Sequence, residues 1–182
     1  TIAHILDVRP SEIIFFFFST EANNLAIFGL LAKLPNGTLP HIVTSNIEHA
    51  SVLEVCKHLE ETKKAEVTYV EVETNGIVDP RKIKKALKQN TILVSVMYAN
   101  NEIGTIQPIP EIAKEIRHFN KINSTNVYFH TDATQAINYL PINVEKLGVD
   151  LMSWNSAKIY GPKGVGALYV RRGTPVSKIM FG

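Results

Sequence analysis

Short apolar runs alternate along this chain with segments whose apolar residues recur at helical spacing. The helical spacing occurs at residues 20–34, 50–61, 79–89 and 109–121. The strand-like runs around these segments are EIIFFFF (12–18), HIVTS (41–45), EVTYVEV (66–72), TILVSVMY (91–98), VYFHTD (127–132), DLMSW (150–154) and VGALYV (165–170). Such alternation predicts an α/β fold, in which crossover helices flank a mostly parallel sheet.

Some of these segments also carry signals for burial or for helix ends. Residues 12–18 are apolar after Glu12, and residues 91–98 form a β-rich, mostly apolar run, which predicts two buried strands, the second of them parallel. Thr20 precedes an apolar helical segment and is predicted to be its N-cap. Asp79 is followed by Pro80, a pair typical of a helix start.

The composition excludes several classes of protein. A chain of 182 residues is long enough for one domain with a buried core. Its net charge of +2 is too small to indicate a nucleic-acid or anionic-membrane partner. Cys56 is the single cysteine, so we expect no internal disulfide and no metal site, and a cytoplasmic location fits. The apolar run 13–18 is too short to cross a bilayer.

Polar residues gather where the predicted strands end. In open α/β sheets, ligands bind beyond the carboxyl ends of the strands. The residues at those ends are Ser19, Thr20, His49, Ala99–Glu102, His130–Gln135 and Asn155–Lys158. The sequence therefore predicts one ligand site built from several strand ends.

These residue types suit pyridoxal 5'-phosphate. This cofactor needs a lysine amine to form a Schiff base, and a carboxylate that keeps its pyridine nitrogen protonated. It also needs a helix N-terminus and hydroxyls for its phosphate, donors near its phenolic oxygen, and a flat group against its ring. The candidates, in that order, are Lys158, Asp132, Thr20, Asn101 or Gln135, and His49.

Each candidate taken alone has an ordinary structural interpretation. Lys158 could be a solvated surface lysine, and Asp132 could cap a turn. His49 could begin its helix, and Asn101 is a typical turn residue. Cys56 lies at helical spacing from its apolar neighbours, which predicts a buried small side chain.

Five longer motifs resemble the NifS/IscS-like cysteine desulfurases of the class V aminotransferase family. They are TEANNLAI, EHASVLEVC, MYANNEIGTIQPI, HTDATQA and KIYGPKGVGALYVRR, and they occur in the family's order over nearly the whole chain. The resemblance implies the large domain of PLP-transferase fold type I. Selenocysteine lyases and other class V enzymes are the alternatives within this family.

The resemblance also implies roles and partners. Lys158 would form the Schiff base, Asp132 would pair with the pyridine nitrogen, and His49 would stack on the ring and help proton transfer. Gln135 would contact the phenolic oxygen, with Asn101 close by, and Thr20 would hold the phosphate. The family removes sulfur from L-cysteine, leaving alanine and an enzyme persulfide. We therefore expect a homodimer that passes sulfur to an acceptor or iron–sulfur scaffold protein for cluster assembly.

The chain departs from the family pattern in three places. Phe16–Phe18 and Ser19 replace a Thr-Ser-Gly-Ala type loop that approaches the phosphate. Asn155, Ser156 and Ala157 replace a Ser-x-His motif, and Asn155 or Ser156 would stand in for its serine. We expect a preceding segment and the family's C-terminal small domain to lie outside residues 1–182, so that this partial large domain alone does not turn over. A non-catalytic fragment or interaction module is the rival interpretation, which FFFFST favours.

Overall fold

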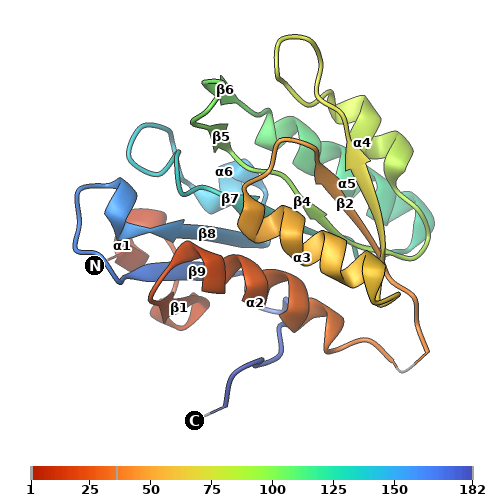
Figure 1. The fold of residues 1–182 in the computed structure, drawn as a ribbon, viewed down its shortest axis with the longest axis horizontal. Helices are drawn as coiled ribbons and strands as arrows, with labels where there is room; N and C mark the ends of the chain where they lie inside the picture. Colours follow the sequence, from red (N-terminus) through yellow and green to blue (C-terminus); the bar gives the residue numbers. More distant parts are fainter. Residues whose placement is uncertain (1, 36, 182) are drawn as a thin grey trace.

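A computed structural model describes residues 2–35 and 37–181 of the chain. Within them, a seven-stranded sheet has the order β1-β9-β8-β7-β4-β2-β3 (Figure 1). Strands β3, β2, β4, β7 and β8 pair in parallel, whereas β9 and β1 are antiparallel to their neighbours. The strands are β1 (Ile13–Phe16), β2 (His41–Ser45), β3 (Glu66–Val70), β4 (Thr91–Ser95), β7 (Tyr128–Asp132), β8 (Leu151–Asn155) and β9 (Gly166–Val170). A separate hairpin pairs β5 (Ala99–Asn100) with β6 (Thr105–Ile106).

Helices cover both faces of the sheet. Their bounds are α1 (Ile2–Leu6), α2 (Ser19–Leu31), α3 (Ala50–Glu61), α4 (Pro80–Ala86), α5 (Ile109–Asn123) and α6 (Val144–Leu147), with short 3₁₀ turns η1 (Pro10–Glu12) and η2 (Ser156–Lys158). Figure 1 shows α2 and α3 side by side over one face of the sheet, and they share an apolar cluster with Ile42 and Leu93. Val43 and Val94 belong to the cluster that includes α5. Adjacent residues of β2 and β4 thus pack into apolar clusters on opposite faces of the sheet, because successive side chains of a strand point to opposite faces.

The predicted α/β fold is confirmed, and so are several of its details. β4 is a buried parallel strand in the middle of the sheet. The Asp79 side chain caps α4 by accepting a hydrogen bond from the backbone N–H of Arg81. Helix α4 ends at Ala86, three residues earlier than the predicted segment 79–89. Among the described residues, none of the helices is long and apolar enough to cross a membrane.

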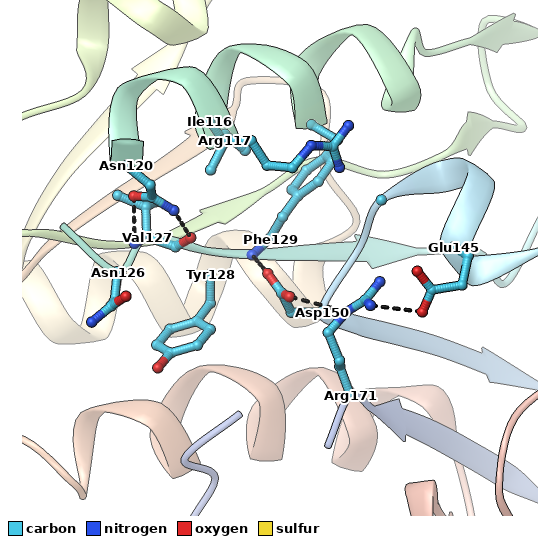
Figure 2. Close-up of a pocket in the computed structure, with 12 residues that line it drawn as sticks. Ile116, Arg117, Asn120, Asn126, Val127, Tyr128, Phe129, Glu145, Asp150 and Arg171 are labelled. Atoms are coloured by element: carbon cyan, nitrogen blue, oxygen red, sulfur yellow. Dashed lines mark hydrogen bonds and ion pairs between the residues drawn. The ribbon is translucent and has the colours of Figure 1, made fainter. Parts of the chain in front are cut away.

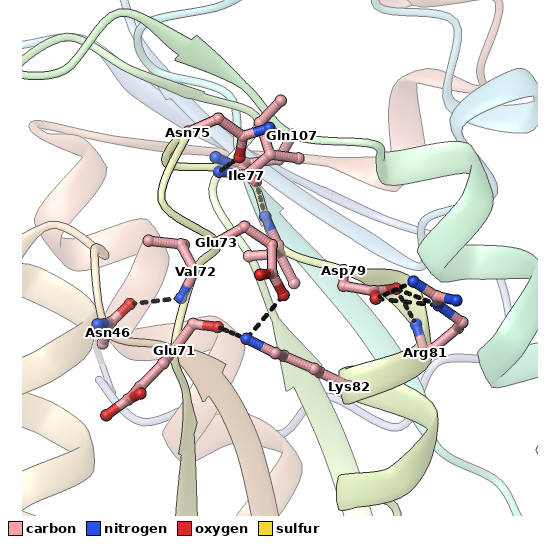
Figure 3. Close-up of polar contacts among 11 residues, drawn as sticks. Asn46, Glu71, Val72, Glu73, Asn75, Ile77, Asp79, Arg81, Lys82 and Gln107 are labelled. Atoms are coloured by element: carbon pink, nitrogen blue, oxygen red, sulfur yellow. Dashed lines mark hydrogen bonds and ion pairs between the residues drawn. The ribbon is translucent and has the colours of Figure 1, made fainter.

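Polar contacts hold the β3–α4 connection in place and join it to the segment after β6 (Figure 3). Lys82 pairs with Glu73 at 2.8 Å and donates to the carbonyl of Glu71. Gln107, which follows β6, accepts from the N–H of Val78 and donates to the carbonyl of Gly76. These side chains satisfy the turn's backbone groups, so this cluster serves the fold.

Two predictions at the start of the chain are wrong. Residues 12–18 do not form a buried strand: β1 ends at Phe16, lies at the edge of the sheet, and leaves Phe15 61% exposed. Phe17 and Phe18 follow it and are also exposed. Thr20 is not the N-cap of α2, because the helix begins at Ser19 and Phe18 occupies the cap position. The Glu21 side chain accepts the N–H of Phe17 at this helix start.

Candidate functional site

A cavity of about 210 Å³ lies where the parallel strands β4, β7 and β8 end. Seven of the nine predicted site residues line it: Ser19, His49, Asn101, Asp132, Gln135, Asn155 and Lys158. The carboxyl ends of neighbouring parallel strands share one sheet edge, which brings together residues far apart in the sequence. Met97, Ala99, Glu102 and Thr134 complete the lining.

Asp132 is the last residue of β7 and is 5% exposed. Its Oδ1 atom accepts the N–H of Thr134 at 2.9 Å, so it does cap a turn. Its Oδ2 atom accepts from Nδ2 of Asn23 at 2.8 Å. The turn interpretation and the cavity interpretation therefore both describe Asp132, and two donors hold its carboxylate in place.

His49 is the N-cap of α3 and also a wall of the cavity. Its Nδ1 atom accepts the backbone N–H of Ser51 at 3.1 Å and lies 2.8 Å from the Ser51 hydroxyl. The ring is therefore anchored through one nitrogen. Here too the structural role and the cavity position coincide.

Lys158 is the last residue of η2, one turn beyond β8, and is exposed. Asn155, at the end of β8, donates from Nδ2 to the hydroxyl of Ser19 at 2.9 Å. Gly166 on β9 permits this close approach of the α2 start, because a Cβ there would lie 2.6 Å from the carbonyl carbon of Phe18. A glycine is thus required where β9 passes the first turn of α2.

Two predicted site residues lie outside the cavity. Thr20 is exposed in the first turn of α2, and its neighbour Ser19 lines the cavity instead. The Ser156 hydroxyl donates to the carbonyl of Pro162 and does not line the cavity. Of the two candidates to stand in for the missing serine, Asn155 is the one that lines the cavity.

Sequence reasoning missed two buried polar residues behind this cavity. Asn23 is 0% exposed and contacts Asp132 from α2. Glu48 accepts from the Ser45 hydroxyl and from the N–H of Met97 through Oε1. Burial raises the pKa of Glu48 to about 8. In the sequence, each of these residues is recognisable only as a polar side chain at a position where a core residue is expected. That pattern does not identify the distant residue with which it forms a hydrogen bond.

The cavity also offers unused hydrogen-bonding capacity. Within the described part of the chain, Oδ1 of Asn155 and Oγ1 of Thr134 are buried and have no hydrogen-bond partner. Buried polar atoms without partners cost free energy, so both atoms favour a polar ligand at this place. Among residues 2–35 and 37–181, no group of three His, Cys, Asp or Glu side chains could hold a metal ion.

A second cavity, of about 360 Å³, lies beside the start of β7, at the other end of this strand from the first cavity (Figure 2). Asp150 accepts the N–H of Phe129 at 2.9 Å and pairs with Nε of Arg171 at 3.2 Å. Arg171 also pairs with Glu145 at 2.7 Å. Burial raises the pKa of Asp150, although Arg171 opposes that shift. Because these charges pair with one another, the first cavity remains the candidate functional site.

The family comparison covers the whole chain. A family model described as aminotransferase class-V matches residues 1–182. Cysteine desulfurase IscS of Dictyoglomus turgidum is 48% identical over 181 residues, which is 100% of this chain and 44% of that protein. A mitochondrial cysteine desulfurase of Arabidopsis thaliana is 46% identical over 94% of this chain and 36% of its own length. The chain thus spans less than half the length of these curated relatives.

Solved structures agree with the sequence comparison. A structure described as a NifS-like protein has a TM-score of 0.92 and 38% identity, covering 100% of this chain and 48% of its own. A structure described as SspA in complex with cysteine has a TM-score of 0.91 and 38% identity, covering 100% of this chain and 50% of its own. The fold of this chain therefore corresponds to about half of each of these structures.

Proposed function

We propose, from the premise that this chain belongs to the aminotransferase class-V family, that it is the cofactor-binding core of a cysteine desulfurase. This family and the cysteine desulfurases depend on pyridoxal 5'-phosphate, and pyridoxal 5'-phosphate is the cofactor assigned here. The proposed substrate is L-cysteine. It is supported by the names of the relatives and by the neighbouring structure that is described as a complex with cysteine.

The observation that carries the proposal is the meeting of Lys158, Asp132 and His49 in one cavity. These residues supply an amine, a carboxylate and an imidazole, the groups that a pyridoxal ring requires. The unpartnered oxygen atoms of Asn155 and Thr134 add buried polar capacity for the same ligand. The residues present therefore fit the ring of the cofactor.

Each residue has a proposed task. The amine of Lys158 would hold the cofactor's aldehyde, and Asp132 would keep a proton on the pyridine nitrogen. His49 would lie against the ring, while Gln135 and Asn101 would contact the phenolic oxygen. For the phosphate we propose Ser19 and Asn155, together with Thr20 in the first turn of α2 and Ser156 beyond the cavity wall. When bound, the cofactor supplies an electron sink for bond cleavage in the substrate.

The sulfur-accepting thiol is a separate requirement. Removing sulfur breaks a carbon–sulfur bond and needs a thiolate to take up the sulfur as a persulfide, leaving alanine. Cys56 does not suit this task, because it is 0% exposed. Burial raises the pKa of its thiol to about 12. We therefore propose that the accepting thiol comes from outside residues 1–182.

The wider setting is also part of the proposal. We infer a homodimer that delivers sulfur to an acceptor or an iron–sulfur scaffold protein, as expected for proteins named IscS. A cytoplasmic location is inferred from the bacterial relatives, although the Arabidopsis relative is mitochondrial. Residues 1–182 are proposed to form part of a large domain, which fits their coverage of the relatives.

The proposal is tested by titrating the protein with pyridoxal 5'-phosphate and recording its visible absorbance. We expect a new absorption band, and hydride reduction followed by peptide mapping should place a pyridoxyl group on Lys158. Lys158→Ala should lose the label, whereas Lys163→Ala, altered in the same exposed loop, should keep it. No band would support the non-catalytic module, and a label on Lys163 would overturn the assignment. Adding cysteine and selenocysteine to separate samples and comparing the change in visible absorbance tests the selenocysteine lyase alternative.

A further inference from the structure

A run of buried polar side chains crosses the sheet and ends at the candidate cavity. Ser95 on β4 and His130 on β7 are paired residues, and Oγ of Ser95 lies 2.8 Å from Nδ1 of His130. Nε2 of His130 lies 3.2 Å from Oγ of Ser153 on β8. The Ser153 hydroxyl donates to Oδ1 of Asn23 on α2. All four side chains are 0% exposed, so each hydrogen must have a protein acceptor.

Asn23 divides this run into two branches. Its Nδ2 atom donates to Oδ2 of Asp132 at 2.8 Å and to Oγ of Ser51 at 2.8 Å. The amide cannot be turned around, because its oxygen would then face the carboxylate of Asp132 and both would be acceptors. Both amide hydrogens of Asn23 therefore point toward residues that adjoin or line the cavity.

Two donors of Ser51, its backbone N–H and its hydroxyl, face Nδ1 of His49. The backbone N–H of Ser51 is a fixed donor and lies 3.1 Å from Nδ1 of His49, so Nδ1 must be an acceptor. The Ser51 hydroxyl accepts from Asn23 and has its own hydrogen free to donate to the same Nδ1 atom, 2.8 Å away. A neutral His49 therefore carries its ring hydrogen on Nε2.

At the opposite end of the run, the hydrogen bonds point from donor to acceptor toward Asn23. The Ser153 hydroxyl donates its one hydrogen to Asn23, so its oxygen must accept from Nε2–H of His130. That leaves Nδ1 of His130 to accept from the Ser95 hydroxyl. Burial lowers the pKa of His130 to about 4, so the ring is neutral near pH 7, as this order requires. Hydrogen bonds that all point one way polarise and strengthen one another.

We propose that Asn23 is a positioning residue for the cavity: its amide orients the Asp132 carboxylate and directs the Ser51 hydroxyl hydrogen onto Nδ1 of His49, where it adds to the hydrogen bond from the Ser51 backbone N–H. The catalytic meaning of this role rests on the proposed function, whereas the order of the hydrogen bonds does not. Asn23 acts only through other residues, because it does not line the cavity.

The first test records the side-chain nitrogen NMR signals of the histidines without added cofactor. We expect His49 and His130 to carry their hydrogens on Nε2. In Asn23→Asp the added carboxylate should accept the Ser51 hydroxyl hydrogen in place of Nδ1 of His49. The Nδ1 signal should then shift toward the value of a nitrogen that accepts a weaker hydrogen bond. The matched control is Asn24→Asp. Asn24 is the next residue of α2, and its side-chain amide donates to the carbonyl of Thr20 in an exposed hydrogen bond. A His49 hydrogen on Nδ1, or an unchanged His49 signal in Asn23→Asp, would overturn the proposal.

The second test measures cofactor affinity and absorbance. Asn23→Asp should weaken pyridoxal 5'-phosphate binding by about tenfold or more relative to Asn24→Asp, because Asp132 loses a charge-assisted donor and gains a neighbouring carboxylate. If Asn23→Asp does not fold, Ser51→Ala removes only the hydroxyl branch and should still shift the His49 signal. Failure of the unmodified protein to bind the cofactor would reject the proposed function and leave the NMR result standing. Normal binding with an unresponsive His49 would reject the role of Asn23 alone.

Discussion

Nδ2 of Asn155 donates to Oγ of Ser19 at 2.9 Å, and this bond joins the end of β8 to the first residue of α2. The two residues belong to the two stretches that depart from the family pattern, Phe16–Ser19 and Asn155–Ala157. The departures therefore meet at one edge of the cavity. Ser19 and Asn155 both line it, so this contact is where altered phosphate recognition is expected.

The phenylalanine loop should weaken the affinity for phosphate. Phe17 and Phe18 are exposed before α2, where a glycine would let the backbone approach an anion. Changing Phe16→Thr, Phe17→Ser and Phe18→Gly together should tighten pyridoxal 5'-phosphate binding about tenfold, or about 1.4 kcal/mol. Absorbance titration measures this. Pyridoxal without phosphate is the control ligand, and an equal gain for both ligands would mean that the loop does not contact the phosphate.

Asp132→Ala should change both the cofactor spectrum and its affinity. The carboxylate would form a charge-assisted pair with the pyridine nitrogen, which is stronger than a neutral hydrogen bond. The same change leaves the N–H of Thr134 without its acceptor, so a loss of about 1 kcal/mol of unfolding free energy is expected as well. Urea denaturation separates the two effects. A stability loss with an unaltered spectrum and affinity would make Asp132 a turn residue only.

Cys56 should be inert in the folded protein. Burial raises its thiol pKa to about 12, so the thiol stays protonated at neutral and mildly alkaline pH. A thiol-specific reagent at pH 8 should label Cys56 only after a denaturant is added. Residues 1–182 alone should form no sulfide and alanine from cysteine, and Cys56→Ala should behave identically. Turnover that disappears in Cys56→Ala would show that this thiol takes part.

Glu48 should make the stability fall with rising pH. Burial raises its pKa from 4.5 to about 8, so between these values the folded state holds a proton that the unfolded state has released. The stabilisation is therefore complete below pH 4.5 and is lost as the pH rises through about 8. Urea denaturation across this range should show a decline for the unmodified protein that Glu48→Gln reduces. Glu54→Gln, on the exposed side of α3, should leave the decline unchanged.

Local signals predicted the elements whose causes lie within a few residues. The Asp79–Pro80 pair placed the start of α4, because a cap acts on the backbone N–H groups of the next turn. The apolar β-rich run of β4 predicted a buried parallel strand, since such a strand has no polar face. Lys158, Asp132 and His49 could be grouped because the ends of parallel strands meet at one edge of a sheet.

The α/β fold and most of the cavity lining follow from the order of residues along the chain, whereas the surroundings of each apolar or polar side chain depend on how the strands and helices pack. β1 is as apolar as a central strand, yet it pairs with β9 alone and so lies at the edge of the sheet, where Phe15 is exposed. Asn23 and its neighbour Asn24 are chemically identical, yet only Asn23 is buried, against a carboxylate 109 residues away. Helical periodicity identifies a buried face, but the hydrogen-bond partner of a buried polar group comes from another strand. Such a partner is fixed only when the sheet assembles, because burial requires it and local sequence does not supply it.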